Sequence, residues 1–439
     1  MTPVAASTAR LPDWSSLSGL GRIAALEQCR RRLAHLGRKL HAVEHIYHAE
    51  APHEGPLAGL PYVAKDMFAT GRSRPLWGCV GPQAPASPPS SLIDRLDQAG
   101  ASLIGAATMT ELAYQPSGIG RRGALNPWQF DRVPGGSSTG SAILVASGCC
   151  FAALGSDTGG SVRMPAHCCG VTALKPGYGR LSLDGAMALA PSLDTAGIFA
   201  RSASDLALIW PELSGEAPGL PQPSQGAALM LDAFADCDSE IAAIVRGAVD
   251  VLAESGLTIV ERSGFPEAAD RHALTVLQAE AARKHRQRID DPNIDATLRK
   301  RLAKGLLITD GELASALAAR DALRDQFILS CLGETGVALL PVMPIRTPRV
   351  NEVDPASSHF NPRTLYALSR FTRFVNYLGL PALAVPAGFD SDGMPVGLQL
   401  IGRQGSEALL LQIAVRLQER TDWHGRVPSA IASEIADEP

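Results

Sequence analysis

Residues 134–161 read PGGSSTGSAILVASGCCFAALGSDTGGS, in which a Gly-Ser cluster stands at each end of an apolar middle. Residues 139–147 are small and apolar, which predicts a buried helix. The segment 149–157 predicts a buried strand that ends at the second cluster. A flexible linker is excluded, because linkers do not alternate with apolar segments such as AILVA. The stretch therefore predicts a helix and a strand flanked by two glycine-rich serine loops.

The alternation of helices and apolar strands continues along the chain. Residues 60–64 predict a buried strand ending at Lys65, and residues 90–108 repeat a helix, a turn at Gly100 and a strand. Strands that are apolar throughout favour a sheet covered on both faces, so we expect an α/β fold. Further strands are expected within 241–263, 336–344, 380–389 and 395–403.

Composition and charge exclude several classes of protein. The 439 residues are 46% hydrophobic and carry a formal net charge of −4 without a basic run, so nucleic acid is not an expected partner. No segment reaches the ~18 apolar residues of a membrane span, and the N-terminus lacks a signal-peptide pattern. The eight cysteines show no C-x-x-C spacing, which predicts reduced, buried thiols. We expect a cytoplasmic protein without metal or cofactor.

The glycine-rich loops match none of the common catalytic or phosphate-binding patterns. A P-loop, a Rossmann fingerprint and a G-x-S-x-G nucleophile elbow are all absent at Ser137 and Ser161. Of the ten histidines, only His53 and His167 lie near these loops, and His167 is expected to be a packing residue. A Ser-His-Asp triad remains open at this point, because triads assemble in space rather than in sequence.

Lys65 is the alternative general base. A lysine at the end of a buried strand has a lowered pKa, because desolvation disfavours its charged form. The competing interpretation is a surface lysine that pairs with the adjacent Asp66. These two residues alone do not decide between the interpretations.

Several motifs in order resemble the amidase signature family. They are GLPYVAKD around Lys65, PGGSSTGSA at 134–142, GSDTGGSVR at 155–163 and DTAGIFARSASDLAL at 194–208, followed by a similar C-terminal segment. The resemblance implies an α/β/α sandwich with a large mixed, mostly parallel central sheet covered by helices on both faces. The chain departs from the usual family pattern at Thr139, Gly177 and Phe374, away from the matched catalytic positions.

The resemblance also implies a Ser–Ser–Lys triad. Ser161 matches the nucleophile, Ser137 matches a bridging serine on a cis peptide bond after Gly136, and Lys65 matches the terminal base. The expected oxyanion-hole donors are the backbone N–H groups of the loop residues Thr158, Gly159, Gly160 and Ser161. Ser138 is the rival bridging serine or a helix cap. Asp157 and Arg163 are expected to pair behind the loop, with substrate binding by Arg163 as the alternative.

Domain organisation and function follow from the same resemblance. We expect one domain over 1–439, built from an N-terminal helical region 1–55, a catalytic core 60–210, a variable helical insertion or cap 227–335 and a C-terminal part of the core 336–439, with a linker at 214–226. The expected activity is hydrolysis of a small-molecule carboxylic amide to carboxylate and ammonia or amine, through an acyl-enzyme on Ser161. The alternative is a component that resembles the A subunit of glutamyl-tRNA amidotransferase and works with partner subunits. A homodimer is possible by base rate.

Overall fold

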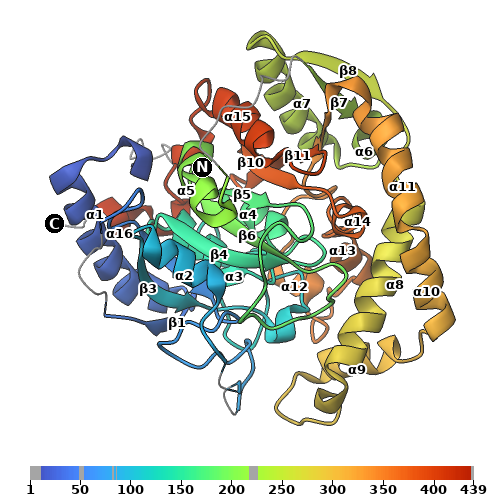
Figure 1. Cartoon of the computed structure of the whole chain (residues 1–439), viewed down its shortest axis with the longest axis horizontal. Coiled ribbons are helices and arrows are strands. Elements are labelled where there is room, and N and C mark those ends of the chain that lie inside the picture. The colour runs from blue at the N-terminus through green and yellow to red at the C-terminus, as the bar shows by residue number, and fades with distance from the viewer. Residues whose placement is uncertain (1–10, 49–53, 82–83, 86, 217–225, 437–439) are drawn as a thin grey trace.

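The computed structural model describes residues 11–48, 54–81, 84–85, 87–216 and 226–436. In this part of the chain, eleven strands form one sheet in the order β1-β3-β2-β4-β6-β5-β10-β11-β9-β7-β8 (Figure 1). The strands are β1 (Val43–Ile46), β2 (Pro61–Lys65), β3 (Ser102–Ala107), β4 (Ala152–Asp157), β5 (Thr172–Lys175), β6 (Thr195–Ala200), β7 (Gly226–Met230), β8 (Thr258–Arg262), β9 (Val337–Pro341), β10 (Ala382–Phe389) and β11 (Pro395–Gly402).

The sheet is mixed, as predicted, but the expectation that it is mostly parallel is wrong. Among the described strands, the pairs β2–β3, β2–β4, β7–β8 and β7–β9 are parallel. The other six pairs, such as β4–β6 and β10–β11, are antiparallel. A continuous apolar run indicates that a strand is buried on both faces. It does not indicate whether the strand is parallel or antiparallel to its neighbours.

Helices cover both faces of the sheet. Helices α3 (Thr139–Ala146) and α4 (Arg163–Cys169) pack against each other and against the strands. A second group, α2 (Ser91–Gln98), α5 (Ala203–Ser214), α7 (Ser239–Glu254) and α15 (Glu407–Gln418), packs along β3, β5, β6, β10 and β11. Further helices of the described chain are α1 (Gly19–Arg32), α6 (Leu231–Ala235), α12 (Val350–Val353), α13 (Pro362–Ala367), α14 (Arg373–Leu378) and α16 (Ala432–Ala436).

The predicted helical cap over 227–335 is only partly helical. Helices α8 (Glu267–Lys284), α9 (Ala296–Gly305), α10 (Asp310–Ala318) and α11 (Arg320–Phe327) lie together at the right of Figure 1. Strands β7 and β8, however, join the main sheet in parallel pairing, with α7 as the crossover helix. Most of the expected linker 214–226 falls on residues 217–225, outside the described residues. The division into domains stays a prediction.

The N-terminal region is also less helical than expected. Helix α1 continues into a π-helical turn, Leu33–Gly37, and the chain then reverses at His41, which has a positive φ of 52°. Residues Val43–Ile46 pair antiparallel with β3 instead of extending the helix. Backbone hydrogen bonds to an open sheet edge therefore override the helical pattern of this segment.

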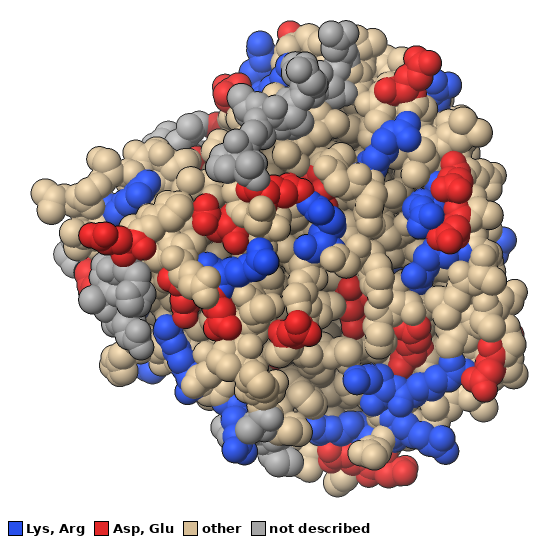
Figure 2. All heavy atoms as spheres, in the orientation of Figure 1, with Lys and Arg blue, Asp and Glu red and all other residues tan. Residues whose placement is uncertain are grey.

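The distribution of surface charges and the burial of the cysteines are those of a globular protein. Acidic and basic side chains are interspersed over most of the face shown in Figure 2, except at its lower right, where Lys and Arg gather. None of the eight cysteines, all of which lie in the described part of the chain, forms a disulfide, and all except the half-buried Cys237 are buried. Among the described residues, no helix has the length and apolar character to cross a membrane. The homodimer and the cytoplasmic location stay predictions.

Helix α3 packs so tightly that Gly140, in its first turn, has no room for a side chain. The helix is buried throughout, as its small residues predict. The N–H of Gly140 donates to the carbonyl oxygen of Thr108 at 2.8 Å. A Cβ at Gly140 would lie 2.2 Å from the carbonyl oxygen of Ala42 and 2.6 Å from the backbone nitrogen of Thr108. The first turn of α3, next to the loop that carries Ser137, is thereby fixed against the end of β3.

We expect Gly140→Ala to destabilise the protein by about 1–3 kcal/mol, because the added methyl group must displace backbone atoms. Gly247→Ala is the matched control, since it lies in the middle of α7 with no heavy atom within 4 Å of its added Cβ. The control should stabilise the fold by about 0.5–1 kcal/mol through helix propensity. Urea unfolding measures both changes, and equal effects of the two substitutions would contradict the packing argument.

Candidate active site

Lys65 lies at the centre of the candidate site. It ends β2, its side chain is fully buried, and its Nζ donates to Ser137 Oγ and to Ser156 Oγ at 2.8 Å each. A surface ion pair with Asp66 is therefore wrong, because the Asp66 carboxylate accepts from the N–H of Leu76 at 2.8 Å instead. Sequence reasoning missed the contact with Ser156, because this serine reads as part of a buried strand.

Burial sets the charge of this lysine. Desolvation lowers the pKa of Lys65 from 10.5 to about 7, although the carboxylates of Asp157 and Asp194 act in the opposite direction. At neutral pH a large fraction of Lys65 is therefore uncharged. A neutral amine has a lone pair and accepts a proton, whereas an ammonium group cannot.

The loop with Ser137 is held by backbone contacts. The peptide bond between Gly136 and Ser137 is cis, as the family resemblance implies. A Cβ at Gly136 would lie 2.6 Å from the carbonyl oxygen of Gln115, so this position has no space for a side chain. The N–H of Ser138 donates to the carbonyl oxygen of Ser161 at 3.2 Å. This last bond brings the two glycine-rich loops side by side.

Ser138 has a different role from the one expected. It precedes α3, but its side chain makes no capping bond to the helix. Its hydroxyl donates to the carbonyl oxygen of Ser156 at 3.1 Å and accepts from the N–H of Ser156 at 3.2 Å. Ser138 thus ties the loop to β4, whereas Ser137 is the serine that contacts Lys65.

Ser161 lies between β4 and α4 at the floor of a cavity. Its side chain is largely buried, and the residue is one of those that line the cavity. Among the described residues, its hydroxyl has no hydrogen-bond partner. The carbonyl oxygen of the same residue accepts from Ser138, which places the Ser161 backbone against the Ser137 loop.

One of the expected oxyanion-hole donors is already engaged. The N–H of Gly160 donates to Asp157 Oδ1 at 2.7 Å. The N–H groups of Thr158, Gly159 and Ser161 make no hydrogen bond within the described part of the chain. These three groups therefore remain as candidate donors, and Gly160 serves to shape the turn with its positive φ of 122°.

Asp157 and Arg163 form the expected pair behind the loop. Both side chains are fully buried, and Arg163 Nη2 lies 2.9 Å from Asp157 Oδ1. The guanidinium also donates to Gln399 Oε1 at 2.7 Å and to Asn376 Oδ1 at 2.6 Å. Although burial raises the pKa of Asp157, the charge and hydrogen bonds of Arg163 hold it well below its ordinary value. Arg163 is thus occupied by protein groups, which rules out the substrate-binding alternative.

Asn376 and Gln399 were missed by sequence reasoning. Asn376 Nδ2 also donates to the carbonyl oxygen of Asp157 at 2.8 Å, so it supports the turn directly. Each stands as a single polar residue within an otherwise apolar segment, FVNYLGL and VGLQLIG. Such an isolated polar residue in a buried segment must be hydrogen-bonded, and this is the signal that could have identified them.

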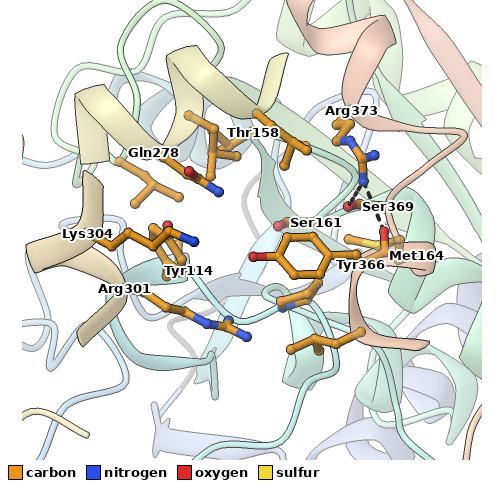
Figure 3. Close-up of a pocket in the computed structure, with 17 residues that line it drawn as sticks. Tyr114, Thr158, Ser161, Met164, Gln278, Arg301, Lys304, Tyr366, Ser369 and Arg373 are labelled. Carbon is orange, nitrogen blue, oxygen red and sulfur yellow. Dashed lines mark hydrogen bonds between the residues drawn. The ribbon is translucent and has the colours of Figure 1, made fainter. Parts of the chain in front are cut away.

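The cavity above Ser161 is built from segments far apart in the chain (Figure 3). Thr158, Gly159 and Ser161 come from the loop after β4, whereas the opposite walls come from α8, α9 and the segment 365–373. Its described lining residues are Ala113, Tyr114, Pro116, Thr158, Gly159, Ser161, Met164, Leu189, Leu274, Leu277, Gln278, Arg301, Lys304, Leu365, Tyr366, Ser369 and Arg373. No acidic residue and no histidine occurs among them.

None of the described histidines lines the cavity that Ser161 faces. His167 is buried, and its Nδ1 accepts from the N–H of Gly397 at 3.0 Å, so it is the packing residue that was expected. His53 lies outside the described residues. Within the described residues, no group of three or more His, Cys, Asp or Glu side chains is arranged to hold a metal ion.

Comparisons with known proteins agree with one another on the family. The sequence matches the profile of the Amidase family over residues 38–411. It is 34% identical to the A subunit of glutamyl-tRNA(Gln) amidotransferase from Marinomonas sp. (strain MWYL1), covering 85% of each chain. The solved structures that it resembles include one described as an amidase, with a TM-score of 0.82 and 30% identity over 91% of this chain and 96% of that one.

Two further solved structures show the functional range of these relatives. The 6-aminohexanoate cyclic dimer hydrolase complexed with substrate has a TM-score of 0.78 at 25% identity, covering 93% of this chain and 96% of that one. The A subunit of the Thermotoga maritima glutamyl-tRNA(Gln) amidotransferase has a TM-score of 0.78 at 25% identity, covering 94% and 96%. Both hydrolases and amidotransferase components are thus similar to this chain over nearly its whole length.

We expect Arg163→Met to destabilise the protein by about 3–5 kcal/mol, because it leaves the buried Asp157 carboxylate without its counter-charge. The double variant Asp157→Asn/Arg163→Met should be more stable than Arg163→Met alone, since no uncompensated charge remains. Arg363→Met on the exposed start of α13 is the control and should change stability by less than about 0.5 kcal/mol. Urea unfolding measures the stability of all three variants. An unchanged free energy of unfolding in Arg163→Met would disprove the stabilising role of the Asp157–Arg163 pair.

Proposed function

Since the chain belongs to the amidase signature family, whose members act on amide C–N bonds, we propose that it hydrolyses a carboxylic amide through an acyl-enzyme on Ser161. The observation that carries the proposal is the fully buried amine of Lys65, 2.8 Å from Ser137 Oγ, next to a loop that presents Ser161 to a cavity. An uncharged amine that contacts a hydroxyl is a proton acceptor for that hydroxyl.

The proposed mechanism uses a two-serine relay. Neutral Lys65 accepts the proton of Ser137 while Ser137 accepts the proton of Ser161, whose oxygen attacks the amide carbonyl. The N–H groups of Thr158, Gly159 and Ser161 stabilise the oxyanion that forms. The relay then returns one proton to the leaving nitrogen, so that the C–N bond breaks and ammonia or an amine departs. Water attacks the resulting ester by the same relay and releases the carboxylate.

The roles of the flanking residues follow from their contacts. Gly136 allows the close approach of the Ser137 loop to Gln115. Ser138, Asp157 and Arg163 position the two loops and do not reach the cavity lining. The proposed reacting groups are therefore Ser161, Ser137 and Lys65, with the other residues fixing their geometry.

Amidotransferase activity is the second candidate function. The amidotransferase A subunits among the curated relatives favour it over a free-standing hydrolase. Among the described lining residues, no carboxylate is present to neutralise the ammonium group of glutamine, which favours the hydrolase. Arg301 and Lys304 suit the carboxylate of glutamine, so the positive charge of the lining does not distinguish the two candidates. Release of ammonia from neutral amides by the purified chain alone supports the hydrolase. Ammonia release from glutamine only in the presence of partner subunits supports the alternative.

We expect Ser161→Ala to reduce amide hydrolysis by at least about 10³-fold while the fold stays intact, because one hydroxyl is removed from a cavity floor. Ser137→Ala should lose activity to a similar degree, since it removes the hydroxyl that links Lys65 to Ser161 in the proposed relay. Ser138→Ala is the matched comparison and should retain more activity than Ser137→Ala, because its hydroxyl contacts backbone atoms of Ser156. Ammonia release and circular dichroism measure activity and fold, and full activity of Ser161→Ala would refute the nucleophile.

The pH dependence of kcat/KM tests the base. We expect kcat/KM to be low at acidic pH and to rise with pH through an apparent pKa of about 7, because protonated Lys65 cannot accept a proton. Asp194→Asn removes a negative charge that raises the pKa of Lys65, so it should move this limb to lower pH. A profile of kcat/KM that stays flat from about pH 5 to 9 in the wild type would exclude Lys65 as the base.

A further inference from the structure

Two cations of α9 face the cavity without a counter-charge. Figure 3 shows Arg301 and Lys304, one helical turn apart, pointing from α9 into the cavity beside Tyr114. Within the described residues, neither side chain makes an ion pair. Arg301 Nη1 donates only to the neutral Gln115 Oε1, at 3.0 Å, and the side-chain Nζ of Lys304 has no hydrogen-bond partner there.

The other cations around this cavity are neutralised. Arg373 lines the same cavity, but it lies 2.7 Å from the buried Asp270 carboxylate. Arg283, on the neighbouring helix α8, lies 2.7 Å from Asp310. The contrast singles out Arg301 and Lys304 as the charges that protein groups leave available.

The carboxylates that line the adjoining hollow hold other groups of the protein. A second hollow borders the cavity at Tyr114 and Arg301, and Glu111 and Asp295 line it. Glu111 lies 3.2 Å from Arg121. Asp295 accepts the N–H groups of Thr297 and Leu298 as the cap of α9, at 2.8 and 3.1 Å. The third acid of that hollow, Asp354, accepts the N–H of Ala356 at 2.9 Å.

Helix α9 as a whole concentrates positive charge. Its sequence ATLRKRLAKG contains four basic residues and no acidic one. Figure 2 shows Lys and Arg gathered at the lower right, over the region where Figure 1 places α9. A cluster of like charges on one short helix is costly unless an anion compensates it. Lys304 lies in the last turn of α9, where its positive charge interacts favourably with the helix dipole. This interaction stabilises the helix and does not neutralise the charge.

The rest of the cavity is mainly apolar. Met164, Leu189, Leu274, Leu277 and Leu365 line it between the Ser161 loop and the outer helices. A ligand that fills such a space combines an apolar body with an anionic end. Guanidinium and ammonium groups that face an apolar cavity bind carboxylates and similar anions through charge-assisted hydrogen bonds.

We propose that Arg301 and Lys304 form an anion-binding subsite, and that the substrate is an amide whose apolar body carries a carboxylate or comparable anion remote from the scissile bond. The inference rests on the proposed amide hydrolysis at Ser161. It extends that function by assigning the substrate class and two residues that determine specificity.

Matched pairs of substrates test the subsite. The anionic probes are monoamides of dicarboxylic acids of increasing chain length, and their methyl esters are the neutral partners. The wild type should show a higher kcat/KM for the acids, at the chain length that spans from Ser161 to α9. High salt should reduce this preference, because it screens the partly exposed charges.

Variants of α9 assign the preference to single residues. Lys304→Gln and Arg301→Gln should each lower the acid-to-ester ratio of kcat/KM by about 5- to 30-fold, mainly through KM, the range expected for a hydrogen bond to a charged group. Arg301→Lys should retain part of the ratio, and Lys304→Glu should lower it further. Lys300→Gln is the control, because it removes the same charge from an exposed position of α9 that does not line the cavity.

The outcomes separate the subsite from the proposed reaction. A second probe series, with the carboxylate on the amine part of the amide, shows whether the anion belongs to the acyl or the leaving group. The subsite would be overturned if the acid-to-ester ratio of kcat/KM were the same in the wild type, Lys304→Gln and Lys300→Gln for both probe series. This holds even if Ser161→Ala is inactive. An active Ser161→Ala would instead overturn the proposed reaction.

Discussion

The removal of Lys65 from water is the constraint on which the site depends. An ammonium group in that position would lose its hydration, so the protein favours the uncharged amine, and two serine hydroxyls satisfy its hydrogen bonds. The strand β2 delivers the amine, the cis-linked loop delivers Ser137, and the turn after β4 delivers Ser161. The sheet has to hold three sequence-distant segments together, and the tight packing of α3 on β3 contributes to that.

Asp157 links the architecture to the chemistry. Its carboxylate accepts the N–H of Gly160 and pairs with Arg163, which fixes the turn that carries Ser161. The same charge raises the pKa of Lys65 and thereby moderates the effect of burial. One buried ion pair therefore serves both the geometry of the nucleophile loop and the electrostatics of the base.

Motif and apolar pattern were sufficient for the fold class and for the pairing of Lys65 with Ser137, whereas the nucleophilic role of Ser161 stays a prediction. The pattern could not supply strand direction, because β4 and β6 would look equally apolar in parallel or antiparallel pairing. It also could not supply the partners of Arg163, since Asn376 and Gln399 lie 213 and 236 residues away in sequence. Arg301 and Lys304 read as an ordinary charged helix, and only the folded chain places them at the cavity.

The cavity draws on two layers of the molecule. The groups proposed to break and form bonds belong to the sheet and the loops it holds, whereas α8 and α9 supply much of the outer wall. Substitutions on these two helices alter what the cavity admits without touching the buried amine or the turn around Asp157. Such a separation lets evolution exchange the compounds that a common scaffold accepts while its reactive centre stays unchanged.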